Sequence, residues 1–300
     1  MNNILWLIRR EVWENRSLWI APLVIAGVIL ITAAFGGIHV DDDDFSFGLR
    51  SGNVDLSAFN PDLDKRRMIY GMTISTFIMI QMFVLAIVVF FYLLDSLLNE
   101  RKDRSILFWK SLPLSDTEVV SSKLLTALVV APAFVLLVSA ATQILFALVW
   151  SLRFSGTPLG NILMAWDGRT WMSVQAAFWM LAPATIIWYL PIAAYLLVVS
   201  VWARKNAFLW AVLPPVSILA IEGLLMQSHH FGEFLARRLG GVFDIMKFEP
   251  SSTITPENVL GEVIRHISKV FIHPETWYGV LAAAAMIFAV IRIRRYRDDS

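Results

Sequence analysis

Residues 18–38 read LWIAPLVIAGVILITAAFGGI, a run of 21 residues without a charged side chain. An α-helix rises about 1.5 Å per residue, so about 20 residues cross the roughly 30 Å hydrocarbon core of a bilayer. No water is present in that core to satisfy backbone groups, and a helix satisfies them within one segment. This stretch therefore predicts a membrane-spanning helix.

Five more long apolar stretches follow along the chain. They cover approximately residues 68–94, 120–152, 173–201, 207–225 and 277–293. Apolar residues make up 57% of the 300 residues, and charged residues make up only 16%. An ordinary soluble domain carries about 25% charged residues. We therefore predict an all-α polytopic membrane protein, with six transmembrane helices in a single transmembrane domain over residues 1–300.

Lysine and arginine are unevenly distributed over this topology. Six spans place both termini on the same side, and the segments on that side hold 14 of the 25 Lys and Arg residues. The segments on the opposite side hold the other 11 in a greater length of chain, so the density of basic residues is higher on the side of the termini. Basic residues concentrate on the cytoplasmic side of membrane proteins. The distribution predicts cytoplasmic N- and C-termini.

Residues 2–16 have the pattern of a helix that lies at the membrane surface. Apolar side chains recur at helical spacing between charged ones, and Trp6 and Trp13 lie seven residues apart. Such a helix can lie in the headgroup layer with its aromatic rings at the boundary. We predict an interfacial amphipathic helix here. The alternative is a continuation of the first span into the cytoplasm.

The segment 226–276, between the fifth and sixth stretches, predicts two short external helices. The first has an apolar stripe that ends at Gly240 and Gly241, residues that commonly stop a helix. The second begins with Pro256 at its first helical position. Both helices are amphipathic, so their apolar faces need a partner. That partner is the membrane, the bundle or a second copy of the chain.

Glu222 lies deep in the fifth apolar stretch. An unpaired charge at the centre of a spanning helix costs about 2.5–3.5 kcal/mol on insertion scales. The side chain should therefore face protein or water. Two interpretations remain open: Glu222 belongs to the translocation path, or it is a hydrogen-bonded glutamate near the outer boundary.

Residues 100–116, between the second and third stretches, read ERKDRSILFWKSLPLSD. Charged residues lead, an apolar cluster follows, and Pro113 stops the run. Ser115 and Glu118 have the spacing of a helix capping box. A rigid aromatic anchor bordered by charge is typical of a docking element, with Trp109 as its hot spot. The alternative is a linker at the membrane surface, with Trp109 in the headgroups.

This loop resembles the coupling region of the permease subunits of type-2 ABC exporters. In that family a Glu-Arg pair ends span two, a Ser-Leu-Pro turn follows a short coupling helix, and a Lys stands at the start of span three. The matching residues here are Glu100-Arg101, residues 111–113 and Lys123. Six spans, the N-terminal amphipathic helix and the elaborated segment before span six also fit the family.

The resemblance implies a homodimer of permeases in the bilayer of a bacterial inner membrane. Two copies of an ATP-binding ABC subunit would lie beneath it, and nucleic acid is no partner. The loop would dock in the ATPase and transmit its closure to the spans. The residues assigned to ATPase coupling are Glu100, Arg101, Asp103, Arg104, Ile106, Phe108, Trp109, Lys110 and Pro113.

The chain contains no GxxxxGK[ST] loop, which cradles nucleotide phosphates in P-loop ATPases. We therefore expect no catalytic residues and no cofactor in this chain, with ATP and Mg bound by the partner ATPase. The histidines lack metal-ligand spacing, so we predict no metal site. The alternative function is an ion-coupled secondary transporter without an ATPase. Such a transporter would be expected to carry more intramembrane charge than one Glu, and usually an inverted repeat.

Overall fold

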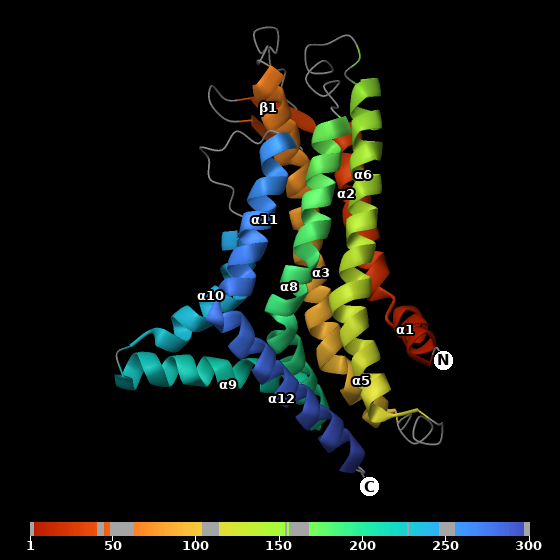
Figure 1. Cartoon of the computed structure of the whole chain (residues 1–300). Helices are drawn as coiled ribbons and strands as arrows, with labels where there is room; N and C mark the ends of the chain where they lie inside the picture. The colour runs from red at the N-terminus through yellow and green to blue at the C-terminus, as the bar shows by residue number, and fades with distance from the viewer. Residues whose placement is uncertain are drawn as a thin grey trace.

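The computed structural model describes residues 3–40, 45–48, 63–103, 114–153, 155, 168–226, 228–245 and 256–296. In these residues the chain is helical, apart from one short antiparallel pair of strands, β1 (Gly37–Val40) and β2 (Phe45–Gly48). Most of the long helices run side by side and form a bundle (Figure 1). Six helices are long and apolar enough to cross a membrane, which confirms the predicted fold class.

The candidate spans follow the six apolar stretches closely, and the third is one rod made of two α-helices joined by a π-helical turn. A second π-helical turn ends the fifth. The bounds are α2 (Ser17–Phe35), α3 (Leu63–Lys102), α5 (Asp116–Leu125) with η2 (Thr126–Val130) and α6 (Ala131–Arg153), α8 (Gly168–Trp202), α9 (Ala207–Ile221) with η3 (Glu222–Met226), and α12 (Pro274–Tyr296).

The rods on either side of the 100–116 loop are longer than the membrane is thick. Helix α3 has 40 residues, which is roughly 60 Å at 1.5 Å per residue and about twice the hydrocarbon thickness. Residues 116–153 form an equally continuous rod of 38 residues. The loop therefore joins two stiff levers that extend well beyond the hydrocarbon core.

The main core lies where α3 and α8 pack together, with α5, α6 and α12 around them. Side chains from these helices interdigitate and are almost fully buried. Leu93 and Leu98 come from α3, Val120 from α5, Leu197 from α8 and Val290 from α12. Close packing of this kind, rather than exclusion of water, holds helices together in a bilayer.

Helix α1 (Asn3–Glu14) is separate from the first span, because the helix breaks at Asn15 and Arg16. In Figure 1 it is turned away from α2 and lies beside α5. Its exposed face carries Trp6 and Trp13, which are 66% and 70% exposed. The break agrees with a distinct helix rather than a continued span. The position of α1 at the membrane surface stays a prediction.

The segment between η3 and α12 contains α10 (His230–Ile245) and α11 (Pro256–Ile272), and α11 begins at the predicted proline. The predicted stop of the first helix at Gly240 and Gly241 is wrong, because α10 runs through both glycines to Ile245. A glycine inside a helix costs only about 1 kcal/mol relative to alanine. Hydrogen bonds from α8 to the turn just before the glycines hold that part of α10 in place.

Helix α11 lies along α8 rather than apart from the bundle. Val263 packs with Ala177 and Leu181, and Val270 packs with Ala184 and Trp188. The sequence allows the membrane, the bundle or a second copy of the chain as the partner of this apolar face. In the structure, α11 packs against the bundle. The helix runs beside a candidate span over part of its length.

Helix α9 has a different direction from the other candidate spans. Figure 1 shows it lying across the axis of α8 and α3. Ala207 and Ala211 are buried where α9 begins, whereas Trp210 and Leu213 are 60% and 55% exposed. Its length and composition suit a membrane-spanning helix, and its apolar surface is left for lipid or for another chain.

Candidate coupling site at the base of the 100–116 loop

The structure describes both ends of the predicted coupling loop, residues 100–103 and 114–116. At these ends α3 stops and α5 begins, with α1 and α12 packed against α5. The docking role assigned to the middle of the loop stays a prediction. The predicted coupling residues that lie outside the described residues are Arg104, Ile106, Phe108, Trp109, Lys110 and Pro113.

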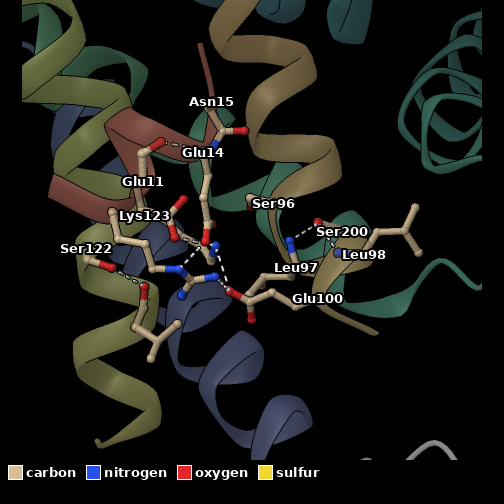
Figure 2. Close-up of polar contacts among 12 residues, drawn as sticks. Glu11, Glu14, Asn15, Ser96, Leu97, Leu98, Glu100, Ser122, Lys123 and Ser200 are labelled. Carbon is tan, nitrogen blue, oxygen red and sulfur yellow. Dashed lines mark hydrogen bonds and ion pairs between the residues drawn. The ribbon is translucent and has the colours of Figure 1, made fainter. Parts of the chain in front are cut away.

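A buried lysine joins the end of α3 to α1. The Nζ atom of Lys123, on α5, lies 2.8 Å from Oε1 of Glu11 and 3.0 Å from Oε1 of Glu100. Figure 2 shows Lys123 between these two carboxylates. Lys123 is 2% exposed, Glu11 1% and Glu100 5%. Tyr92 of α3 also donates a hydrogen bond of 2.8 Å to Oε2 of Glu11.

A buried arginine joins the two ends of the loop. Arg294, on α12, places Nη2 3.1 Å from Oε2 of Glu100 and Nε 3.7 Å from Oδ1 of Asp116. Arg10, on α1, lies 3.9 Å from Oε1 of Glu100 and 2.6 Å from Oε1 of Glu14. The charges alternate in sign, so each buried ion has an opposite partner.

These contacts form one network, the base network, which consists of Glu11, Glu100, Asp116, Lys123 and Arg294. Removing one partner from a buried ion pair leaves the other charge without compensation, which costs about 3–5 kcal/mol. The base network therefore fixes the positions of α1, α5 and α12 relative to the end of α3. Among the residues that the structure describes, no group of three or more His, Asp or Glu could hold a metal ion.

Arg101, also a predicted coupling residue, binds the end of α8. Its Nη2 donates hydrogen bonds to the backbone oxygens of Ser200 (2.7 Å) and Ala203 (2.8 Å). Basic side chains near a helix C-terminus satisfy its last carbonyls in this way. The Ser200 hydroxyl in turn accepts from the backbone N–H groups of Leu97 and Leu98 (Figure 2). Arg101 thus ties α3 to α8, whereas Asp103 is exposed.

The return from the loop into α5 is fixed by the predicted capping box. The Ser115 hydroxyl accepts from the backbone N–H of Glu118 at 3.2 Å, and the Glu118 carboxylate accepts from the backbone N–H of Ser115 at 2.8 Å. Both bonds satisfy N–H groups that would otherwise lack a partner at the helix start. The box confirms the sequence interpretation of these two residues.

Glu222 lies in η3, far from the base network in sequence. Its carboxylate accepts hydrogen bonds from the backbone N–H groups of Phe231 (2.9 Å) and Gly232 (3.3 Å) and from the Ser228 hydroxyl (3.1 Å). It therefore caps the N-terminus of α10, where a negative charge is favoured. This geometry corresponds to the hydrogen-bonded interpretation of Glu222. A role in the translocation path stays a prediction.

Sequence reasoning identified Glu100 and Lys123 but missed their partners. Glu11 and Lys123 are 112 residues apart, and Glu100 and Arg294 are 194 residues apart. One signal was present: Glu11 follows Leu7 by four residues, which places both on the same helix face. A carboxylate on the apolar face of an amphipathic helix indicates a buried cation elsewhere in the chain.

A comparison with known proteins finds a match that includes the coupling site. Residues 67–174 match the family model described as ABC-2 family transporter protein. The match runs from α3 through the 100–116 loop and the α5–α6 rod into the start of α8. The search of curated proteins gives no significant match. Together with the six apolar helices, this match over residues 67–174 supports an ABC-2 type permease subunit.

Proposed function

We propose that this permease subunit forms the path of an ATP-driven exporter, with a second permease copy beside it and two ABC ATPase subunits beneath it. The 100–116 loop receives the movement of the ATPase. No P-loop motif occurs in the chain, so the energy comes from the partner. The proposal includes the orientation with both termini in the cytoplasm.

The observation that supports coupling most strongly is the base network. Its ion pairs join both described ends of the loop to other helices of the bundle. Arg294 of α12 pairs with Glu100 and Asp116, and Lys123 of α5 pairs with Glu100. Arg101 adds a direct link to α8. A displacement of the loop would therefore reach α5, α8 and α12 together, because each link is a direct contact with a residue at an end of the loop.

The rod that leaves the loop also contains a place where its geometry can change. The π-helical turn η2 begins at Thr126, three residues beyond Lys123. Its closing bond runs from the backbone N–H of Ala131 to the carbonyl of Thr126, five residues apart. π-helical turns inside α-helices occur often at functional sites. We infer that η2 absorbs part of the movement that enters α5.

Reconstitution tests this function directly. Proteoliposomes that contain the permease and its ATPase should export cargo only with ATP, and permease alone should export none. The matched control is the complex with a hydrolysis-deficient ATPase. Export by the permease alone, driven by an ion gradient, would contradict the proposal and favour a secondary transporter.

A further inference from the structure

A second buried cation, Arg238 of α10, lies away from the base network. Arg238 is 4% exposed. Its guanidinium carbon lies 4.6 Å from the centre of the Trp188 ring, and the Trp188 Nε1–H donates to the backbone oxygen of Arg238 at 3.0 Å. The ring and the cation therefore hold α10 against the middle of α8.

Arg238 lies well away from the coupling site along the bundle. On α8, Trp188 precedes Ser200, the residue bound by Arg101, by 12 residues, which is roughly 18 Å of helix. On α12, Gly279 precedes Arg294 by 15 residues, or roughly 22 Å. With the coupling site at the cytoplasmic surface, as in the proposed function, both distances fall within a hydrocarbon core of roughly 30 Å. An ionisable side chain held at this depth is a functional-site hypothesis by default.

The described side chains place no carboxylate in direct contact with Arg238. Among the residues whose side chains the structure describes, no Asp or Glu oxygen lies within 4.0 Å of its guanidinium, and Nη2 is buried without a hydrogen-bond partner. Nη1 donates only a long bond of 3.4 Å to the backbone oxygen of Glu275. The carboxylate of Glu275 instead lies 3.6 Å from the exposed neighbour Arg237.

A glycine and an aromatic ring line the slot that holds the guanidinium. Gly279 of α12 lies against Nη2 so closely that a Cβ at this position would overlap the guanidinium, and it would also approach Pro191. The Trp188 ring also lies against the guanidinium. Within the part of the chain whose side chains are described, this slot thus holds a cation whose Nη2 has no hydrogen-bond acceptor.

We propose that Arg238 recognises the anionic head of an amphipathic cargo. This inference rests on the proposed function, because it assigns the substrate class of that exporter. A carboxylate or phosphate oxygen supplies the acceptor that Nη2 lacks, and arginine binds both groups through paired N–H donors. The apolar part of the cargo lies against the exposed apolar side chains of the bundle. Binding replaces the contacts of Arg238 with Gly279 and the Glu275 backbone, so it separates α10 from α12.

The same helix connects this slot to the coupling site. Gly279 lies near the beginning of α12, and Arg294 near its end binds Glu100 and Asp116. On α8, Trp188 contacts Arg238 and Ser200 accepts from Arg101. A cargo that shifts α12 at one end is therefore expected to act on the loop at the other end and to stimulate the ATPase.

Binding to the permease alone tests the site without the ATPase. The protein in phosphatidylcholine nanodiscs is titrated calorimetrically with dodecyl phosphate, dodecanoate, uncharged dodecanol and inorganic phosphate, with empty discs as the blank. Both anionic amphiphiles should bind the unmodified protein about tenfold or more tightly than dodecanol, and inorganic phosphate should not bind measurably. Equal affinity for dodecanol and the anionic probes would overturn the inference, and this comparison needs no variant to fold.

Variants then locate the site. Arg238→Gln should lose that preference, Arg238→Lys should keep part of it, and the control Arg237→Gln, which changes an exposed cation one residue away, should bind as the unmodified protein does. Unchanged anion preference in a folded Arg238→Gln protein would overturn the inference. In the complete complex, dodecyl phosphate should stimulate ATP hydrolysis, and Arg238→Gln should abolish this. Absence of any ATP-driven export would instead contradict the proposed function, while the binding result would still decide the role of Arg238.

Discussion

At the scale of single residues, each buried ion of the base network lies beside a partner of opposite charge. Lys123 contacts Glu11 and Glu100, and Arg294 contacts Glu100 and Asp116. Desolvating such ions is expensive, so the network is weak evidence for stability in itself. It is stronger evidence for a fixed geometry, because the pairs are satisfied only when α1, α5 and α12 are all in place.

We expect Lys123→Met to destabilise the protein by about 3–5 kcal/mol, because Glu11 and Glu100 would be left buried without their shared cation. Adding Glu11→Gln should restore part of that loss, since the two residues interact and their effects are not additive. Thermal unfolding of the detergent-solubilised variants measures both effects. The control is Arg265→Gln, which breaks an exposed pair with Glu262 and should change stability by at most about 1 kcal/mol. A Lys123→Met protein as stable as the control would show that the ion pairs are not made.

At the scale of helices and turns, the ends of the elements are set by side-chain caps. Ser115 and Glu118 begin α5, Arg101 closes α8, and Glu222 begins α10. Each cap supplies hydrogen-bond partners to a helix terminus that would otherwise lack them. Arg101 also joins α3 to α8, and Glu222 joins η3 to α10. The caps therefore decide how the loop and the α9–α10 segment leave the bundle.

Glu222→Ala should raise the hydrogen-exchange rates of the Phe231 and Gly232 amides, because both lose their acceptor. Glu222→Gln keeps one oxygen acceptor and should raise these rates much less. Exchange measured by mass spectrometry on peptides that cover α10 distinguishes the two, with peptides of α6 as the internal control. Identical protection in the alanine variant would refute the capping role. Unchanged export in the glutamine variant would exclude a function for the charge itself.

The sequence predicted those features that depend on neighbouring residues and missed those that depend on distant ones. The spans were predicted because each apolar run is long enough to cross a bilayer, and the Ser115 box because its partners are three residues apart. The Gly240 stop was wrong, since contacts of α10 with Trp188 and Tyr189 outweigh a local preference. The direction of α9 could not be predicted either, because hydropathy contains no information on helix tilt.

At the scale of the whole molecule, the structure is a bundle of long helices in which buried ion pairs link the helices around the base of the 100–116 loop. The α3 helix and the 116–153 rod bracket the loop, while α8 and α12 are tied to its base. Apolar residues cover much of the outside, as expected for a protein in lipid. The family match covers the two levers and the loop between them.

The proposed orientation can be measured with single cysteines, because the chain contains none. Lys102→Cys, at the exposed end of α3, should resist a membrane-impermeant maleimide in intact cells. Ser155→Cys, at the exposed end beyond α6, should react with it. Permeabilised cells, in which both positions should react, provide the control for accessibility. The reverse labelling pattern would place the loop outside the cell, away from any cytoplasmic ATPase.

The central claim is that a separate ATPase drives this permease through the 100–116 loop, and the Trp109→Ala variant tests it most directly. ATP hydrolysis and cargo export are measured together in proteoliposomes that contain the complete complex, with Trp202→Ala, an exposed tryptophan at the end of α8, as the matched control. The account predicts that Trp109→Ala still assembles with the ATPase and hydrolyses ATP but exports at least about tenfold less cargo, because a docking hot spot contributes about 2 kcal/mol or more. Export at the control rate would contradict the account.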